Sequence, residues 1–264
     1  IIRERNLSMV LFETIAVAFG MFSALPLPQP SWNEKNMRYA MCAFPLVGVV
    51  CGGMWAAWAW VCAHLGLPVL LRAAGLCLAP VLVTGGIHLD GYADTCDALA
   101  SCAEPSRKQA ILSDPHCGAF AVIRLCSYFV ATLGLCAAIT PTPAAAFCMG
   151  VCFTLERALS GLAVTSFPLA KNTGLAHTFA TTADRDRVRL VLTVLCIILC
   201  AVLLAAGGGL AAAAALLVFW QYYHTAKKQF GGLSGDLAGW FVQRAEFWML
   251  AALTAGQWLW GWTI

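Results

Sequence analysis

Residues 204–217 read LAAGGGLAAAAALL, and two apolar runs, 189–206 and 209–226, meet in this stretch. Three consecutive glycines permit a tight turn, whereas the alanines and leucines on either side favour helix. Small side chains also let two helices approach closely in a bilayer, where packing rather than the hydrophobic effect drives association. The stretch therefore predicts a helical hairpin inside a membrane.

The composition of the whole chain agrees with that prediction. Of 264 residues, 61% are hydrophobic and 11% are charged, whereas a soluble domain carries about 25% charged residues. So few charges cannot cover a water-exposed globule. We expect an all-α, polytopic integral membrane bundle in which residues 1–264 form a single membrane-embedded domain.

Seven apolar segments are long enough to cross a bilayer, which takes about 20 residues in a helix. A further apolar stretch, 9–25, contains Glu13 and runs directly into PLPQPSW, so it predicts a retained hydrophobic or re-entrant helix rather than a cleaved signal. The predicted spans are 39–64, 67–88, 119–140, 143–166, 189–206, 209–226 and 245–262.

The connections alternate between short and long, so all long loops lie on one side of the membrane. The long ones cover residues 26–38, 89–118, 167–188 and 227–244. Positive charge favours the cytoplasmic side. The short-loop side carries only Arg72, near a span end, whereas the long-loop side is rich in basic residues, which predicts a multi-pass protein of the cell membrane with the long loops in the cytoplasm. The basic residues of the long-loop side are Lys35, Arg38, Arg107, Lys108, Lys171, Arg185, Arg187, Lys227, Lys228 and Arg244, with Arg189 at its edge.

Two other features of the composition concern the cysteines and the net charge. The thirteen cysteines form no C-x-x-C pair and mostly lie in apolar runs, which predicts packing residues rather than a zinc site or disulfide framework. The net charge of +3 is small and by itself says nothing about nucleic acid; we expect no nucleic-acid partner.

The stretch GGIHLDGYADTCD, residues 85–97, places three carboxylates beside a buried span. Asp90, Asp94 and Asp97 follow the spacing i, i+4, i+7 and therefore share one face of a helix. Carboxylates on a common face suit Mg²⁺, with Mn²⁺ as the alternative. A solvated acidic helix start is the other interpretation, but ionisable groups at the end of a buried span are usually functional. His88 lies on the opposite side of this helix, so it is a candidate for orienting a neighbour.

Two polar loops carry further candidates. In ILSDPHCGAFAVIRL, residues 111–125, Asp114 is a candidate metal ligand or, like Ser113, a helix cap before Pro115, and His116 is a candidate orienting residue. In KKQFGGLSGDLAG, residues 227–239, Asp236 is either a metal ligand or a helix cap. The loop glycines there could offer backbone N–H groups to phosphate, or they could simply form a turn. The candidate phosphate-binding residues of this loop are Lys228, Gly231, Gly232 and Gly235.

Two basic residues elsewhere could also meet a phosphate. Lys171 lies in the third long loop, and Arg157 lies within the span before it. A buried arginine requires an anionic partner, which could be Glu156, another carboxylate or a substrate phosphate. Metal-binding carboxylates together with basic residues favour chemistry on a phosphoanhydride, and no Walker motif is present.

Four segments, in order along the chain, resemble the cobalamin synthase family, also called adenosylcobinamide-GDP ribazoletransferases. They are FSALPLP (22–28), TGGIHLDGYADTCDAL (84–99), ILSDPHCGAFAVI (111–123) and FGGLSGDLAG (230–239).

The resemblance implies an integral membrane transferase in vitamin B12 assembly. Such an enzyme uses Mg²⁺ to transfer the adenosylcobinamide-phosphate group of adenosylcobinamide-GDP to the 5′-oxygen of α-ribazole or its 5′-phosphate. It releases GMP and forms adenosylcobalamin or its 5′-phosphate. Partners expected besides these substrates are the lipid bilayer and either a second copy of the chain or other cobalamin-assembly enzymes.

Within such an enzyme we expect Asp90, Asp94 and Asp97 to hold the metal, with Asp114 and Asp236 as further ligands. Asp94, Asp97 and Asp114 are the expected catalytic residues, and Asp97 could instead serve as general base. Lys228, Lys171 and Arg157 are the expected contacts to phosphate.

Two other functions are compatible with the same residues. One is a CDP-alcohol-type membrane phosphotransferase, which also uses spaced aspartates. The other is a cation or corrinoid transporter, although the acidic residues lie at span ends and the chain shows no repeated halves.

Overall fold

The chain folds into a bundle of α-helices. The computed structural model describes residues 7–27 and 32–260, and within these ranges it contains no β-strand. The predicted all-α fold is confirmed. The long helices are α3 (Ala40–Leu65), α4 (Val69–Thr84), α7 (Ala119–Ala138), α8 (Pro143–Ser166), α10 (Arg185–Ala205), α11 (Gly209–Phe230) and α12 (Gly235–Trp260). The shorter ones are α1 (Leu7–Phe22), α2 (Glu34–Met37), α5 (Ile87–Ala100), α6 (Pro105–Ile111) and α9 (Leu175–Thr182).

Each predicted span corresponds to one of the long helices. By length and apolar composition, α3, α7, α8 and α10 can cross a membrane, and α4 does so only together with α5. The last two helices, α11 and α12, are also long but more polar. In α12, polar residues such as Gln243 and Glu246 are buried in the interior of the bundle. The predicted segment 245–262 extends two residues past the described part of the chain.

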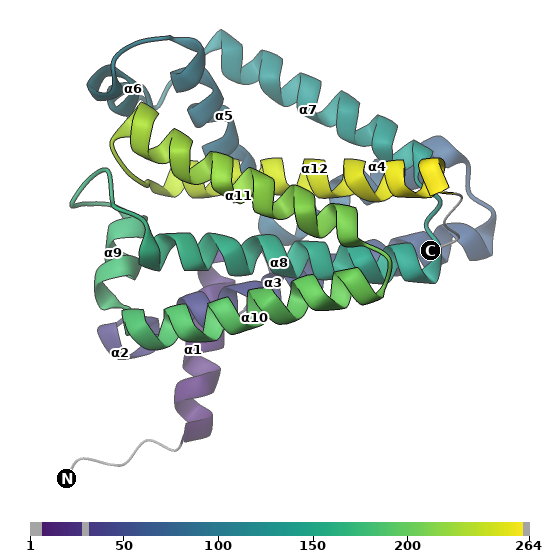
Figure 1. Cartoon of the computed structure of the whole chain (residues 1–264), viewed down its shortest axis with the longest axis horizontal. Helices are drawn as coiled ribbons and strands as arrows, with labels where there is room; N and C mark the ends of the chain where they lie inside the picture. The colour runs from purple at the N-terminus through teal and green to yellow at the C-terminus, as the bar shows by residue number, and fades with distance from the viewer. Residues whose placement is uncertain (1–6, 28–31, 261–264) are drawn as a thin grey trace.

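The long and short connections lie at opposite ends of the bundle, as the alternation predicted. Figure 1 shows α2, α6 and α9 at one end, together with the α11–α12 loop, and the short turns at the other. In the same view α1 lies across the direction of the long helices. It is apolar but shorter than a span, in agreement with a hydrophobic helix that does not cross.

Two consecutive glycines separate α4 from α5. Gly85 and Gly86 have φ values of +66° and +82°, a left-handed conformation that glycine adopts without strain. The two helices are bent by 98° at this point, so the predicted span 67–88 ends at Thr84. The segment after α1 packs against the bend, since the Ala24 amide donates to the Val83 carbonyl at 2.8 Å.

Close backbone contact joins α3 and α8 in the core. A β-carbon on Gly52 would lie 2.5 Å from the Cα of Gly150, and one on Gly48 would meet the backbone of Phe153. Larger side chains at these positions would force the two helices apart. Small residues therefore set this helix separation, as expected where packing drives association.

The core also contains a buried ion pair. Arg157 and Glu156 are both fully buried, and Nη1 of Arg157 lies 2.6 Å from Oε1 of Glu156. The same nitrogen donates to the Phe153 carbonyl at 2.9 Å. Of the three anionic partners predicted for Arg157, the structure selects Glu156. A guanidinium enclosed in the core has no path to solvent, so the predicted phosphate contact of Arg157 does not fit the structure.

Gly52→Ala should weaken the bundle, because the added methyl group meets backbone that cannot move away. We expect a loss of about 1–3 kcal/mol, the usual cost of overpacking, measured as a lower thermal unfolding midpoint in detergent. Gly53→Ala is the matched control, because a β-carbon there meets nothing within 4 Å. Equal midpoints for both variants would contradict the packing described.

Arg157→Met should destabilise the protein by about 3–5 kcal/mol, because it leaves Glu156 charged and unpaired in the core. The double variant Glu156→Leu/Arg157→Met removes both charges and should recover most of the stability. Thermal unfolding in detergent measures both. A single variant as stable as the wild type would show that the pair is not enclosed.

Candidate active site

Helix α5 carries the three predicted aspartates on one face. Asp90 is exposed and Asp94 and Asp97 are half-buried, which confirms that they share a helix. The opposite face is in the core: His88 is 5% exposed and packs against the rings of Phe22 and Phe44, with centroids 6.4 and 5.7 Å away. His88 therefore faces away from the carboxylates, and its orienting role stays a prediction.

A cavity of about 670 Å³ opens beside the α4–α5 bend, and we call it the carboxylate cavity. Asp90 and Asp94 from α5 line it together with Asp114 from the α6–α7 loop. The structure thus brings together three of the predicted acidic residues from two separate segments. The remaining lining residues are Gly85, Gly86, Ile87, Leu89, Ala93, Pro115, Cys117 and Leu125.

Asp114 is held by its neighbour and does not cap a helix. Its Oδ1 accepts hydrogen bonds from the backbone N–H of His116 at 3.0 Å and lies 2.7 Å from the His116 ring Nδ1. These bonds lower the pKa of Asp114, so it is ionised at neutral pH. Helix α7 begins at Ala119 with Gly118 as its N-cap, so the predicted cap at Ser113 or Asp114 is wrong.

The first turn of α12 lies directly on α5. A β-carbon on Gly91 would lie 2.6 Å from the Asp236 carbonyl oxygen, so only glycine permits this contact. Burial and, after it, repulsion from Asp90, Asp236 and Asp97 together raise the pKa of Asp94 to about 6. Burial also raises the pKa of Asp236, to which Asp90 adds. The carboxylates therefore repel one another across the α5–α12 contact, and a cation would relieve that repulsion.

Asp97 lies against the start of α7 and does not line the carboxylate cavity. Its carboxylate is so close to Gly118 that any β-carbon at position 118 would collide with it. Sequence reasoning did not identify Gly118 as the residue that positions Asp97.

The donor set fits a magnesium ion that is completed by substrate. Among the described residues, no three His, Cys, Asp or Glu side chains converge into a ready-made metal site. Magnesium, however, is usually held by one or two carboxylates, with water and substrate phosphates filling the other positions. Asp90 and Asp94, which repel each other beside a cavity, satisfy that requirement.

The glycine loop after α11 has a different role from the one predicted. The N–H groups of Gly231 and Gly232 both donate to the Ala226 carbonyl. The next N–H, of Leu233, donates to Pro168 at 2.8 Å, which ties this loop to the α8–α9 loop. Gly231 and Gly232 therefore end a helix and permit two loops to pair, and their N–H groups are not available to phosphate.

A second, smaller cavity of about 260 Å³ lies among the long loops, and we call it the loop cavity. Lys171, Gly235 and Asp236 line it. The Lys171 ammonium donates to Ser113 Oγ at 2.7 Å and to the Gln109 carbonyl at 3.3 Å. These two partners were missed from the sequence, because they lie about sixty positions away and only folding brings them to Lys171.

The other two candidates in the α11–α12 segment can also be placed. Ser234 Oγ accepts from the Leu237 amide at 3.3 Å, so Ser234 rather than Asp236 caps α12. Lys228 is exposed and lines neither cavity. Its contact with a substrate phosphate stays a prediction.

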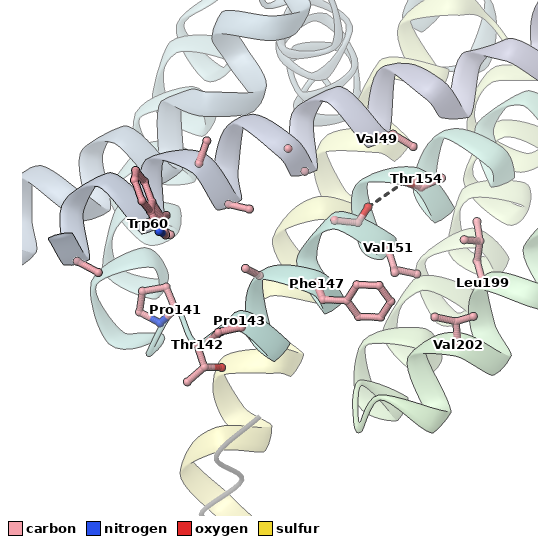
Figure 2. Close-up of a pocket in the computed structure, with 18 residues that line it drawn as sticks. Val49, Trp60, Pro141, Thr142, Pro143, Phe147, Val151, Thr154, Leu199 and Val202 are labelled. Atoms are coloured by element: carbon pink, nitrogen blue, oxygen red, sulfur yellow. Dashed lines mark hydrogen bonds between the residues drawn. The ribbon is translucent and has the colours of Figure 1, made fainter.

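A third and larger cavity is not the candidate site. It has a volume of about 990 Å³ and lies between α3, α8 and α10 at the end with the short turns. Figure 2 shows Val49, Trp60, Phe147 and Leu199 around it. None of its lining residues is ionisable, so it cannot supply acid–base or metal chemistry.

Comparison with known proteins identifies relatives over most of the chain. The chain is 41% identical to the adenosylcobinamide-GDP ribazoletransferase of Lachnoclostridium phytofermentans, over 87% of this chain and 88% of that protein. It is 33% identical to the enzyme of that name from a Geobacillus species, over 84% and 87% of the two chains. The one from Clostridium perfringens is 27% identical, over 90% and 96%. No solved structure matches the chain.

Residues 14–254 match the family described as cobalamin-5-phosphate synthase. This range includes the bend, both cavities and the carboxylates around them. The relatives bearing the transferase name cover nearly the whole chain, so the resemblance found in the four motifs is confirmed. The chain is a transferase enzyme and belongs to the cobalamin-5-phosphate synthase family.

Proposed function

We propose that the protein transfers the adenosylcobinamide-phosphate group of adenosylcobinamide-GDP to α-ribazole or its 5′-phosphate and releases GMP. The observation that carries this proposal is the meeting of Asp90, Asp94 and Asp114 around one cavity, next to a second cavity that contains Lys171. The first arrangement suits a pyrophosphate with its metal, and the second suits the molecule that attacks it.

The attacking atom follows from the chemistry of the acceptor. The family description names a cobalamin-5-phosphate as product, and an acceptor already phosphorylated at its 5′-oxygen has no 5′-hydroxyl. We therefore replace the 5′-oxygen expected from the resemblance with a hydroxyl of the ribose ring. That oxygen bonds to the phosphorus on the cobinamide side, and the bond from this phosphorus to GMP breaks.

The residues around the carboxylate cavity would have separate roles in the reaction. Asp90 and Asp94 would hold Mg²⁺, or Mn²⁺ as the alternative, with Asp114 on the same cavity as a further ligand. The ion would neutralise charge on the pyrophosphate and on departing GMP. Asp97, which lies against Gly118, adds negative charge beside Asp94. This charge would strengthen the binding of a cation by Asp94.

Asp236 is our candidate for the general base. It lines the loop cavity and interacts electrostatically with Asp90 and Asp94, so it lies between the two cavities. A half-buried carboxylate with a raised pKa accepts a proton readily from a hydroxyl group. The proton of the attacking ribose hydroxyl would pass to Asp236 rather than to Asp97, the base expected from the sequence.

The orientation in the membrane is part of the proposal. Both cavities lie at the end of the bundle that carries the long loops and most of the basic residues. Because positive loops stay in the cytoplasm, the active site would face the cytoplasm from the cell membrane. Soluble nucleotide substrates would reach it there.

The direct test is release of GMP by the purified protein in detergent or liposomes. We expect GMP from adenosylcobinamide-GDP only when α-ribazole or its 5′-phosphate and Mg²⁺ are all present. The product is followed by chromatography with mass detection. Folded protein that forms no GMP under these conditions would rule out the proposed reaction.

Asp94→Asn should lower kcat by about 100-fold or more, because the variant loses charge stabilisation in the transition state. It should also raise the Mg²⁺ concentration needed for half-maximal rate. Asp186→Asn is the matched control, since Asp186 is an exposed carboxylate in the first turn of α10. Unchanged turnover of the Asp94 variant at limiting Mg²⁺ would remove Asp94 from the metal site.

A further inference from the structure

Two arginines lie near each other beside α5. Arg124 is in the second turn of α7, and Arg244 is in the third turn of α12. Both of these helices pack against α5. Each guanidinium group interacts electrostatically with Tyr92 of α5, and the two groups repel each other. We call Arg124 and Arg244 the arginine pair. The proposed reaction does not use it.

Helical spacing places the arginine pair behind α5 as seen from the carboxylate cavity. Tyr92 is two residues from Asp90 and two from Asp94, and at about 100° per residue its side chain points away from both. Cys96, which also interacts with both arginines, is two residues beyond Asp94. The two cavity carboxylates therefore lie on one side of α5 and the arginine pair on the other. An anion bound by the pair would be separated from the carboxylate cavity by a helix.

No carboxylate neutralises the arginine pair in the part of the chain that the structure describes. Arg244 donates to the neutral side chain of Gln221 at 3.2 Å, and its guanidinium lies 4.9 Å from the centre of the Trp240 ring. Its Nε is buried and has no hydrogen-bond partner among the described residues. Arg124 is exposed and forms no ion pair with any of them. Two neighbouring positive charges without a negative one favour the binding of an anion.

The surroundings of the pair are those of a lipid-facing surface. Only 22% of the apolar stretch of α7 is buried, so most of this helix faces lipid. Trp248 lies one turn after Arg244, and Trp220 is next to Gln221; they are 47% and 59% exposed. Exposed tryptophans gather at the level of the lipid headgroups. Both α7 and α12 begin at the end of the bundle with the long loops (Figure 1), so the nearest headgroups are those of the leaflet on that side.

We propose that the arginine pair binds the phosphate of an anionic phospholipid in the leaflet next to the long loops. A guanidinium group offers its donors in a planar arrangement that matches phosphate oxygens, so Arg124 and Arg244 would share one phosphate. A zwitterionic headgroup brings an ammonium group of its own, which the pair would repel, so a lipid with a net negative charge is favoured.

The bound lipid would also stabilise the arrangement of the helices. Its phosphate would cancel the repulsion between Arg124 and Arg244 and connect α7 to α12 behind the helix that carries the aspartates. Its acyl chains would lie along the exposed apolar surface of α7, which includes Val130. The lipid site does not depend on the proposed reaction, because no substrate takes part in it.

The test measures lipid binding by the whole chain in nanodiscs of phosphatidylcholine and phosphatidylglycerol. An arginine near a headgroup contributes about fivefold to the affinity for an anionic lipid, so Arg124→Gln/Arg244→Gln should weaken phosphatidylglycerol binding by roughly 20-fold. Native mass spectrometry counts the lipids that stay bound to the protein. The wild type should retain phosphatidylglycerol in preference to phosphatidylcholine, and the double variant should lose this preference.

Lys35→Gln/Lys227→Gln is the matched control. Both lysines are exposed at the end of the bundle with the long loops, and the variant loses the same amount of charge. It should keep the lipid preference of the wild type. If the double arginine variant does not fold, Arg124→Gln replaces it, because this exposed side chain has no ion pair to lose in the described chain. A loss of about fivefold in affinity is then expected.

Thermal unfolding gives a second measurement. A ligand that binds only the folded state stabilises it, so a larger share of phosphatidylglycerol should raise the unfolding midpoint of the wild type and of the lysine control. The midpoint of the double arginine variant should stay unchanged. Inorganic phosphate added to protein in phosphatidylcholine alone should have no effect on any of the three.

Three results would overturn the proposal. The first is equal retention of phosphatidylglycerol by the wild type and by the double arginine variant. The second is an equal loss in the lysine control, which would indicate a general attraction between the basic face and an anionic surface. The third is stabilisation by inorganic phosphate that disappears in the double arginine variant, which would assign the site to a soluble phosphate.

Discussion

The turn at Gly85 and Gly86 is the constraint on which the site depends. Both residues adopt left-handed backbone conformations, which end α4 and redirect α5 by 98°. A straight continuation would carry three aspartates along the axis of a span, where ionisable groups are costly. The turn instead brings them to the end of the bundle with the long loops. There Asp90 and Asp94 share a cavity with Asp114.

Close approach at glycine then assembles the acidic residues from separate elements. Gly91 permits the first turn of α12 to lie on α5, and Gly118 permits the start of α7 to lie on Asp97. Gly232 acts in the same way between two loops, where any side chain would collide with the backbone at Leu169 and Ala170. At each of these glycines, backbone or carboxylate atoms occupy the place where a β-carbon would lie, so no larger residue fits.

The basic residues show how strongly packing decides chemical role. Arg157 and Lys171 are both cations that could have met a phosphate. Arg157 points into the core, where Glu156 neutralises it at 2.6 Å. Lys171 lies in a polar cavity, where neutral oxygens position its ammonium and leave its charge available. The two cations differ in burial: Arg157 is sealed in the core, whereas Lys171 lines a cavity that a ligand can enter.

The sequence by itself determined the fold class through its composition, and the seven long helices through the length of the apolar runs. Helical spacing determined the shared face of Asp90, Asp94 and Asp97. Each of these features depends on residues that are close together in the chain. The motifs also determined the family. Tertiary structure alone decided the partner of Arg157, the pairing that occupies Gly231 and Gly232, and the bond from Lys171 to Ser113. In the cavities the reason is distance along the chain: loops separated by about sixty residues meet only after the helices between them have packed.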